Sequence, residues 1–146
     1  MALPNEIHPF HFAGAGQGYQ VSNSLRFRNS NSAYLSRTPA TSGTTTKWTV
    51  SLWTKRGNLG SGNYPLFGTS SGTSPTQVYF MSSTADTLRW YEAGGDYQTT
   101  QLFRDPSAWY HLVFVRDSDN ATQADRAIIY VNGVRQTVSN QTNGMF

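Results

Sequence analysis

Three stretches of alternating apolar and polar residues constrain the fold of this chain more than any other feature. They read WTVSLWTKRG at 48–57, WYHLVFVRDSDN at 109–120 and AIIYVNGVRQTV at 127–138. A period of two residues places successive side chains on opposite faces of an extended strand. Each stretch contains turn residues, and Asn132-Gly133 is the strongest short hairpin signal in the sequence. We therefore expect antiparallel strands, and we find no helical period.

The composition favours an all-β domain. Ser, Thr, Asn and Gly make up more than a third of the 146 residues, while charged residues are only 13%. Thr, Val and aromatic residues pack well on a pleated sheet, and Gly and Asn open turns. The length suits one domain with a sizeable core. Many short strands joined by turns predict an antiparallel β-sandwich or barrel.

The alternation also predicts which face each side chain occupies. In the strand expected at 47–55, Trp48, Val50 and Leu52 share one face, which leaves Trp53 on the wetter face. In the strand expected at 109–116 both alternating sets are apolar, which predicts a central strand between two covered faces. Further strands are expected at 25–27, from Tyr34, and at 64–68, 77–82, 87–92, 97–103, 127–131 and 134–138, with a turn at 28–32.

Residues 1–17 are expected to form an extended N-terminal arm. Pro4, Pro9 and several glycines oppose regular structure there, while Ile7, Phe10 and Phe12 are apolar. We expect these three side chains to anchor the arm, with a frayed terminus as the alternative. The arm has neither the cationic start nor the apolar run of a secretory signal. No stretch has the apolar length of a membrane span, so we expect no membrane insertion.

Taken together, the three stretches resemble the laminin G-like and pentraxin-type jelly rolls of the concanavalin A-like fold. Such domains carry (F/W)-T-x-S-x-W-x-K, then W-(H/Y)-H-(L/V)-x-(F/V), then (L/I)-Y-V-N-G. Here they read WTVSLWTK, WYHLVFV and IIYVNG, in the same order. The resemblance covers roughly residues 18–138 and implies an all-β antiparallel β-sandwich, a jelly roll over residues 18–146. Domains of this kind continue for several more strands, so we expect a jelly roll that is incomplete at its C-terminus, completed by further chain or by another copy.

Two segments, SLRFRNSNSAYLSRTP and LFRDPSAWYHLVFVRD, are similar to those of laminin G-containing structural proteins of tailed phages. This resemblance implies a non-catalytic virion protein of the tail, fibre or capsid, assembled in the host cytoplasm and exposed on the particle. Its expected partners are other virion proteins, further copies of itself and a glycan of the host surface. A capsid decoration protein without a ligand and a soluble calcium-dependent lectin remain as alternatives.

The residues offer little for catalysis. Glucanases that share this fold use several acidic residues on one strand, because glycoside hydrolysis needs two carboxyl groups beside one bond. The only glutamates here are Glu6 and Glu92, and no expected strand carries two alternating acids. His111 lies inside a strand, where a core or hydrogen-bonded role is favoured over that of a ligand or base. Cysteine is absent and the basic residues are scattered, so we expect neither thiol chemistry nor a nucleic-acid partner.

Two sets of candidate binding residues remain. Sugar rings stack on exposed aromatic faces, and Trp53, Tyr91 and Tyr97 are the candidates, although ordinary sandwich packing is favoured for each of them. Calcium prefers oxygen ligands, and Asp117, Asp119 and Asp125 cluster in one loop. The spacing of these acids does not match an EF-hand, so a solvated hairpin loop is favoured over a calcium site.

Overall fold

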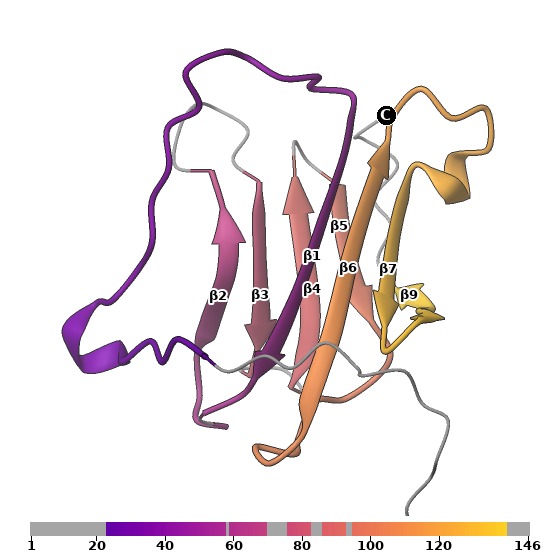
Figure 1. The fold of residues 1–146 in the computed structure, drawn as a ribbon. Helices are drawn as coiled ribbons and strands as arrows, with labels where there is room; N and C mark the ends of the chain where they lie inside the picture. Colours follow the sequence, from indigo (N-terminus) through magenta and orange to yellow (C-terminus); the bar gives the residue numbers. More distant parts are fainter. Residues whose placement is uncertain (1–22, 58, 70–75, 83–85, 93–94, 140–146) are drawn as a thin grey trace, which may run out of the picture. The chain divides into compact units, whose positions relative to one another are not determined.

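The computed structural model describes residues 23–57, 59–69, 76–82, 86–92 and 95–139. The chain divides into two compact units, residues 1–40 and residues 41–146, which are described separately (Figure 1). None of the described helices is long and apolar enough to cross a membrane.

The described part of the first unit, residues 23–40, contains one short 3-10 turn, Asn29–Asn31. The turn expected at 28–32 is therefore confirmed, but the strands expected around Leu25–Phe27 and from Tyr34 do not form. Leu25 and Tyr34 are 72% and 78% exposed. The residues there do alternate between apolar and polar, but a strand needs a neighbouring strand to complete its backbone hydrogen bonds. No described strand pairs with these residues.

The second unit is built from β-strands with almost no helix. A 3-10 turn, η2 (Gln123–Asp125), is the one helical element described in this unit. The described strands are β1 (Lys47–Lys55), β2 (Asn63–Gly68), β3 (Gln77–Met81), β4 (Thr87–Glu92), β5 (Gly95–Thr99), β6 (Trp109–Asp117), β7 (Ala127–Val131), β8 (Val134–Arg135) and β9 (Val138–Ser139).

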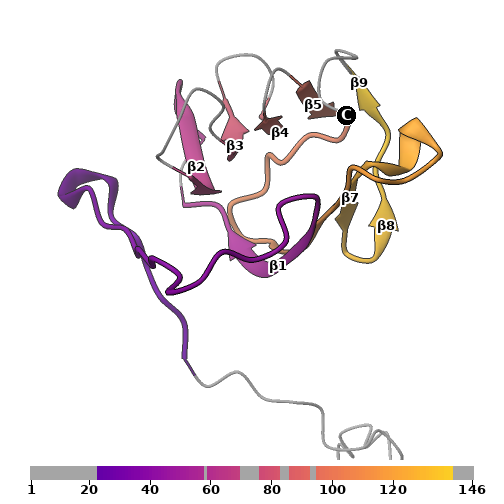
Figure 2. The same cartoon turned by 90° about the horizontal axis from the view of Figure 1, so that it is seen from above.

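These strands form two antiparallel sheets that face one another (Figure 2). The first sheet has the order β1-β6-β7-β8, and the second has the order β2-β3-β4-β5-β9. The expected all-β sandwich of the jelly-roll type is confirmed. Strand β6 is central, as expected, but its outer face is only half-buried, and Trp109 is 50% exposed. The apolar character of both faces therefore did not mean that both faces are covered.

The chain changes sheet after the β7–β8 hairpin. A single returning strand was expected at 134–138, yet β8 pairs with β7 and β9 pairs with β5 of the opposite sheet. Strand β5 also ends at Thr99 rather than at Phe103, which leaves the sheet and packs into the core instead. Alternation along the sequence cannot reveal such changes, because both segments remain extended.

The core lies between the inner faces of the sheets. Trp90 of β4 is fully buried, and its ring centroid lies 5.1 Å from Trp48 of β1 and 6.0 Å from Phe114 of β6. The cluster of buried residues also contains Val78, Phe80, Leu88, Tyr97, Phe103, Tyr110, Leu112, Ala127, Ile129 and Val131. Strands β5, β6 and β7 bury alternate side chains, which is the pattern that two packed sheets require, while β3 buries four consecutive side chains from Val78 to Met81.

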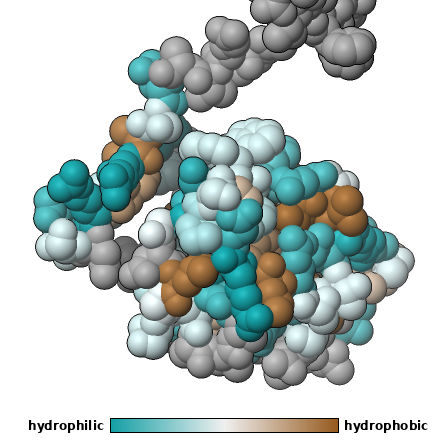
Figure 3. All heavy atoms as spheres, turned by 90° about the horizontal axis from the view of Figure 1, so that it is seen from below, coloured by the Kyte–Doolittle hydropathy of each residue, from teal (hydrophilic) through white to brown (hydrophobic). Residues whose placement is uncertain are grey.

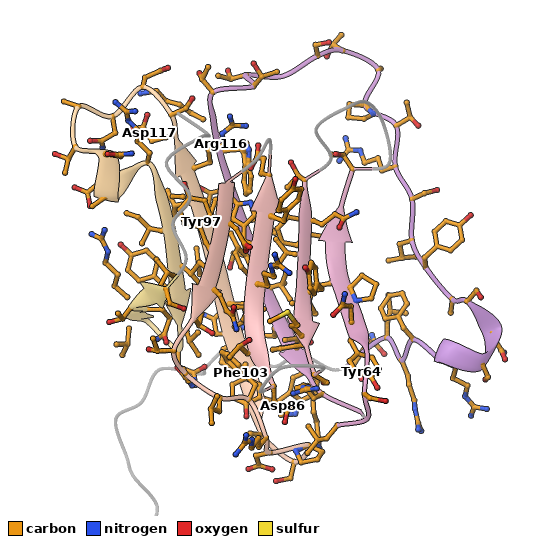
Figure 4. All side chains as sticks on the ribbon, turned by 180° about the vertical axis from the view of Figure 1, so that it is seen from behind. Tyr64, Asp86, Tyr97, Phe103, Arg116 and Asp117 are labelled. Atoms are coloured by element: carbon orange, nitrogen blue, oxygen red, sulfur yellow. The ribbon has the colours of Figure 1, made fainter. Side chains whose placement is uncertain are left out.

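Largely buried arginines form ion pairs near both ends of the sandwich. Figure 4 shows Asp86 and Phe103 near one end and Arg116 toward the other. Near Phe103 and Asp86, the guanidinium of Arg56 donates to the Asp86 carboxylate at 3.1 Å and to the Phe103 carbonyl. Near the other end, Arg116 of β6 donates to the Glu92 carboxylate of β4 and so links the two sheets. Both carboxylates are largely shielded from water, so each is stabilised by a charged partner.

Candidate functional site: an aromatic platform on the outer face

The outer face of the first sheet carries exposed aromatic rings. The register pairs Trp53 of β1 with His111 of β6, and Lys55 with Trp109. Residues two apart on a strand share a face, so these four side chains lie together on one surface. We call Trp53, His111 and Trp109 the aromatic platform. The expectation that Trp53 occupies the wetter face is confirmed, since its side chain is 63% exposed.

Trp53 and His111 stack on one another. Their ring centroids lie 5.0 Å apart and their planes differ by 20°. The Ser118 amide donates to the Thr46 carbonyl at 2.9 Å. Every second residue pair from Trp48–Arg116 onward is therefore a hydrogen-bonded pair. Trp53 and His111 are then a non-hydrogen-bonded pair, in which side chains lie closer together. The strand register thus favours this contact.

Three hydrogen bonds hold His111 in place. Its Nε2 lies 2.9 Å from the Ser51 Oγ, its amide donates to the Asn132 side chain at 2.9 Å, and its carbonyl accepts from the Asn132 amide at 2.8 Å. Ser51, His111 and Asn132 belong to the three alternating stretches at 48–57, 109–120 and 127–138. The three stretches therefore meet at His111, and the expected hydrogen-bonded role of this residue is confirmed. His111 lies on the outer face, not in the core.

The platform presents flat apolar surface that is held rigidly. Stacking against His111 restricts the Trp53 ring, and the cross-strand pairs fix the position of Trp109 relative to it. A pyranose ring offers an apolar face of C–H groups, which packs against an aromatic ring in the same way as other apolar groups. Ser51 and Lys55 add a hydroxyl and an ammonium group on the same strand. Such a surface is compatible with stacking of a sugar ring.

The other two sugar-binding candidates do not join this surface. Tyr97 is 8% exposed and packs in the core with Trp90, so its candidate place on a wet face is wrong and the favoured core packing is correct. Burial raises its pKa, with a further contribution from the Glu92 charge. Tyr91 is half-buried and alternates with the inward-facing Trp90, which places it on the outer face of the second sheet. Trp53 and Tyr91 thus lie on opposite faces of the sandwich.

The outer face of the second sheet carries a polar group that sequence reasoning missed. Arg89 of β4 donates to both carboxylate oxygens of Asp96 on β5, from Nε at 2.7 Å and from an Nη. The hydrogen bond to Asp96 raises the pKa of Arg89. The Arg89 guanidinium also lies 5.9 Å from the ring centroid of Tyr79 on β3. The sequence shows Arg89 and Asp96 as opposite charges on either side of a turn. Only the pairing of β4 with β5 shows that the two side chains meet.

The three candidate calcium ligands are each close to a cation. The Lys47 Nζ lies 3.0 Å from the Asp117 Oδ1 and 3.9 Å from the Asp119 Oδ2. Asp125 lies 2.7 Å from an Nη of Arg135. Within the described residues, no group of three or more side chains of the metal-binding types gathers in one place. The proximity of these acids in sequence is therefore not matched by a shared site in the structure.

The anchoring residues Ile7, Phe10 and Phe12, with the expected boundary between the arm and the domain, lie outside the described residues.

The segment 102–117 has structural roles in the sandwich. Phe103 is buried, Arg104 lies 3.4 Å from Asp86, and the Asp105 carboxylate accepts from the amide and the hydroxyl of Ser107 at 2.7 and 2.6 Å. Such a side-chain turn lets the chain enter β6 directly.

Comparison with known families agrees with the architecture. Residues 28–146 match a laminin G family model described as Concanavalin A-like lectin/glucanases superfamily. The match covers most of the chain, so the protein belongs to this superfamily. No curated protein and no solved structure matches the chain.

Proposed function

We propose that this protein is a non-catalytic binding domain that takes up glycans on its aromatic platform. The observation that carries the proposal is the stacked, hydrogen-bonded pair of Trp53 and His111 on an open sheet face. A large, mostly exposed aromatic ring presents apolar surface to water, and a ligand that covers the ring removes this surface from water. Membership of a superfamily of lectins and glucanases supports a sugar as that ligand.

The carboxylates near the sandwich core support a non-catalytic role. Glycoside hydrolysis needs one carboxyl group as an acid and a second as a base or nucleophile. Glu92 accepts from Arg116 and from the Trp90 indole at 3.1 Å, and Asp86 accepts from Arg56. Burial alone would raise the pKa of the Asp86 carboxyl group, but Ser82, Arg56 and Arg104 lower it, which makes Asp86 a poor proton donor.

We further propose that the domain is displayed on the surface of a tailed-phage particle, beside other virion proteins and further copies of itself. The similarity of the segments 24–39 and 102–117 to phage structural proteins supports this role. A glycan-binding face would then contact the surface of the host cell.

Glycan binding is tested by screening the purified chain against immobilised polysaccharides and titrating those that bind. Trp53→Ala should weaken binding about tenfold or more, as is common for a central aromatic contact. Tyr34→Ala removes an aromatic residue of the first unit that is more exposed than Trp53, 78% against 63%, and should leave binding unchanged. Equal affinity of Trp53→Ala and the unaltered protein would exclude the platform as the site.

The location is tested by immunogold electron microscopy of purified particles with an antibody against residues 23–139. Label on tails or fibres would support an adhesion role, and even label on heads would indicate a decoration protein. Unlabelled particles would rule out the virion role and favour a soluble lectin.

A further inference from the structure

The two lysines that begin and end β1 differ in their surroundings. Both lie on the exposed outer face that carries the platform. Lys47 is held by Asp117 and Asp119, and the hydrogen bond with Asp117 raises its pKa. Lys55 stands opposite Trp109 in the register, two residues from Trp53. A cation therefore lies beside the aromatic platform.

The charge of Lys55 acts on the carboxyl group of Asp105. The pKa of Asp105 is lowered mainly by its hydrogen bonds with Ser107, and the charge of Lys55 is the weakest of the contributing causes. The Asp105 Oδ1 thus accepts two hydrogen bonds within its own turn. Among the described residues, Lys47 forms two ion pairs and Lys55 forms none, which leaves Lys55 as the better partner for an added anion.

We propose that the glycan bound by the platform is acidic, with carboxylate groups on its sugar rings. The ring stacks on Trp53 or Trp109 while its carboxylate pairs with Lys55. This inference rests on the proposed glycan-binding function and specifies its ligand class. The two contacts act on different parts of one sugar: the stacking contact is open to any pyranose, and the ion pair selects uronic acids. Exposed ion pairs are worth little individually, so Lys55 supplies selectivity while the rings supply most of the affinity.

The test compares polygalacturonate with its methyl ester, because the two polymers share one backbone and differ in charge. At low salt the full chain should bind the acid form about two- to fivefold more tightly per site, the range expected for one exposed ion pair. The preference should decline at 1 M salt, where screening acts within about 3 Å. Lys55→Gln should abolish the preference and keep the binding of the ester. Lys47→Gln is the matched control, and it should keep the preference.

The outcomes separate the two proposals. A preference that disappears in Lys55→Gln but persists in Lys47→Gln supports the ion pair. Equal binding of the two polymers overturns the acidic ligand and leaves glycan binding standing. A preference that survives in Lys55→Gln also overturns it, because the charge then acts elsewhere. A chain that binds neither of these polymers but binds neutral polysaccharides overturns the acidic ligand alone, and a chain that binds no polysaccharide overturns both proposals.

Discussion

Arg56 shows how much one residue contributes at the end of the sandwich that contains Asp86 and Phe103. Its side chain is 1% exposed and follows directly after β1. It reaches Ser82 and Asp86 in the β3–β4 connection and the Phe103 carbonyl in the β5–β6 connection. Its guanidinium also lies 4.9 Å from the ring centroid of Phe80. One cation thus ties three connections together.

Replacing Arg56 with Met should destabilise the fold strongly. The substitution removes the buried cation, so that Asp86 keeps only Ser82 and the exposed Arg104 and the Phe103 carbonyl loses this donor. Breaking a buried ion pair typically costs about 3–5 kcal/mol. Arg104→Met is the control, because Arg104 contacts the same carboxylate from an exposed position. Urea denaturation should show a small change for Arg104→Met, and equal losses for both variants would contradict the role of burial.

Asp86 should make stability depend on acid pH. Burial alone would raise the pKa of its carboxyl group, but Ser82, Arg56 and Arg104 together lower it. A carboxyl group whose pKa is lowered in the folded state stabilises the fold above its unfolded pKa of about 3.9, and this contribution is lost as the pH falls further.

The variant that tests this is Asp86→Asn, since asparagine tolerates the local φ of 57°. We expect a lower free energy of unfolding at pH 7 and a flatter decline below about pH 4 than in the unaltered protein. Parallel acid profiles of the two proteins would contradict the assignment.

Among the elements, the β7–β8 hairpin is fixed by its two turn residues. Asn132 and Gly133 have φ values of 50° and 81°, the left-handed conformation that a tight hairpin turn requires. Asn132 also binds the main chain of His111. The hairpin therefore supports the strand that carries the platform.

Gly133→Ala should cost about 1–2 kcal/mol, because a Cβ is unfavourable at this φ. Gly57→Ala is the matched control, since neither position has an atom within 4 Å of an added Cβ and only Gly133 has positive φ. Thermal denaturation should separate the two variants. A similar small effect in both would mean that the turn tolerates side chains.

The loop between β6 and β7 should respond weakly to calcium. Its acids lie beside Lys47 and Arg135, so a cation must compete with charges already present. We expect millimolar calcium to leave the melting temperature unchanged, and Lys47→Gln to permit at most a small rise. A ligand at one hundred times its Kd adds about 2.7 kcal/mol, so a clear rise in the unaltered protein would establish a calcium site.

At the scale of the whole second unit, stability depends on contact between the two inner faces. Phe114 of the first sheet meets Phe67 and Trp90 of the second, with ring centroids 5.3 and 6.0 Å away. Hydrophobic residues on the surface form separate patches rather than one cluster like that of the core, as Figure 3 shows for the lower end of the sandwich. The sheets should therefore unfold together.

Phe114→Ala should lower the free energy of unfolding by about 3–5 kcal/mol, because it removes a fully buried ring and leaves a cavity. Its neighbour Val113 faces outward and is half-buried, so Val113→Ala should cost much less. Far-ultraviolet and near-ultraviolet circular dichroism should report one transition in each protein. Separate transitions would show that the sheets unfold independently.

Local pattern was sufficient where one strand had one buried face. The bounds of β1 and β4, the exposure of Trp53 and the turn at Asn132-Gly133 all followed from alternation and turn chemistry. These features depend on neighbours a few residues away, which is why the sequence alone determined them.

Partnership between distant segments was decided only by the tertiary structure. The alternation at Leu25–Phe27 matches that of a strand, yet no described strand pairs with it. The sequence also did not settle the inward position of Tyr97 or the pairing of β9 with the second sheet. Nor did it show that Trp53 stacks on His111, which lies 58 positions later. Each of these outcomes depends on which strands become neighbours, because pairing and packing fix the register and decide which of two apolar faces is covered.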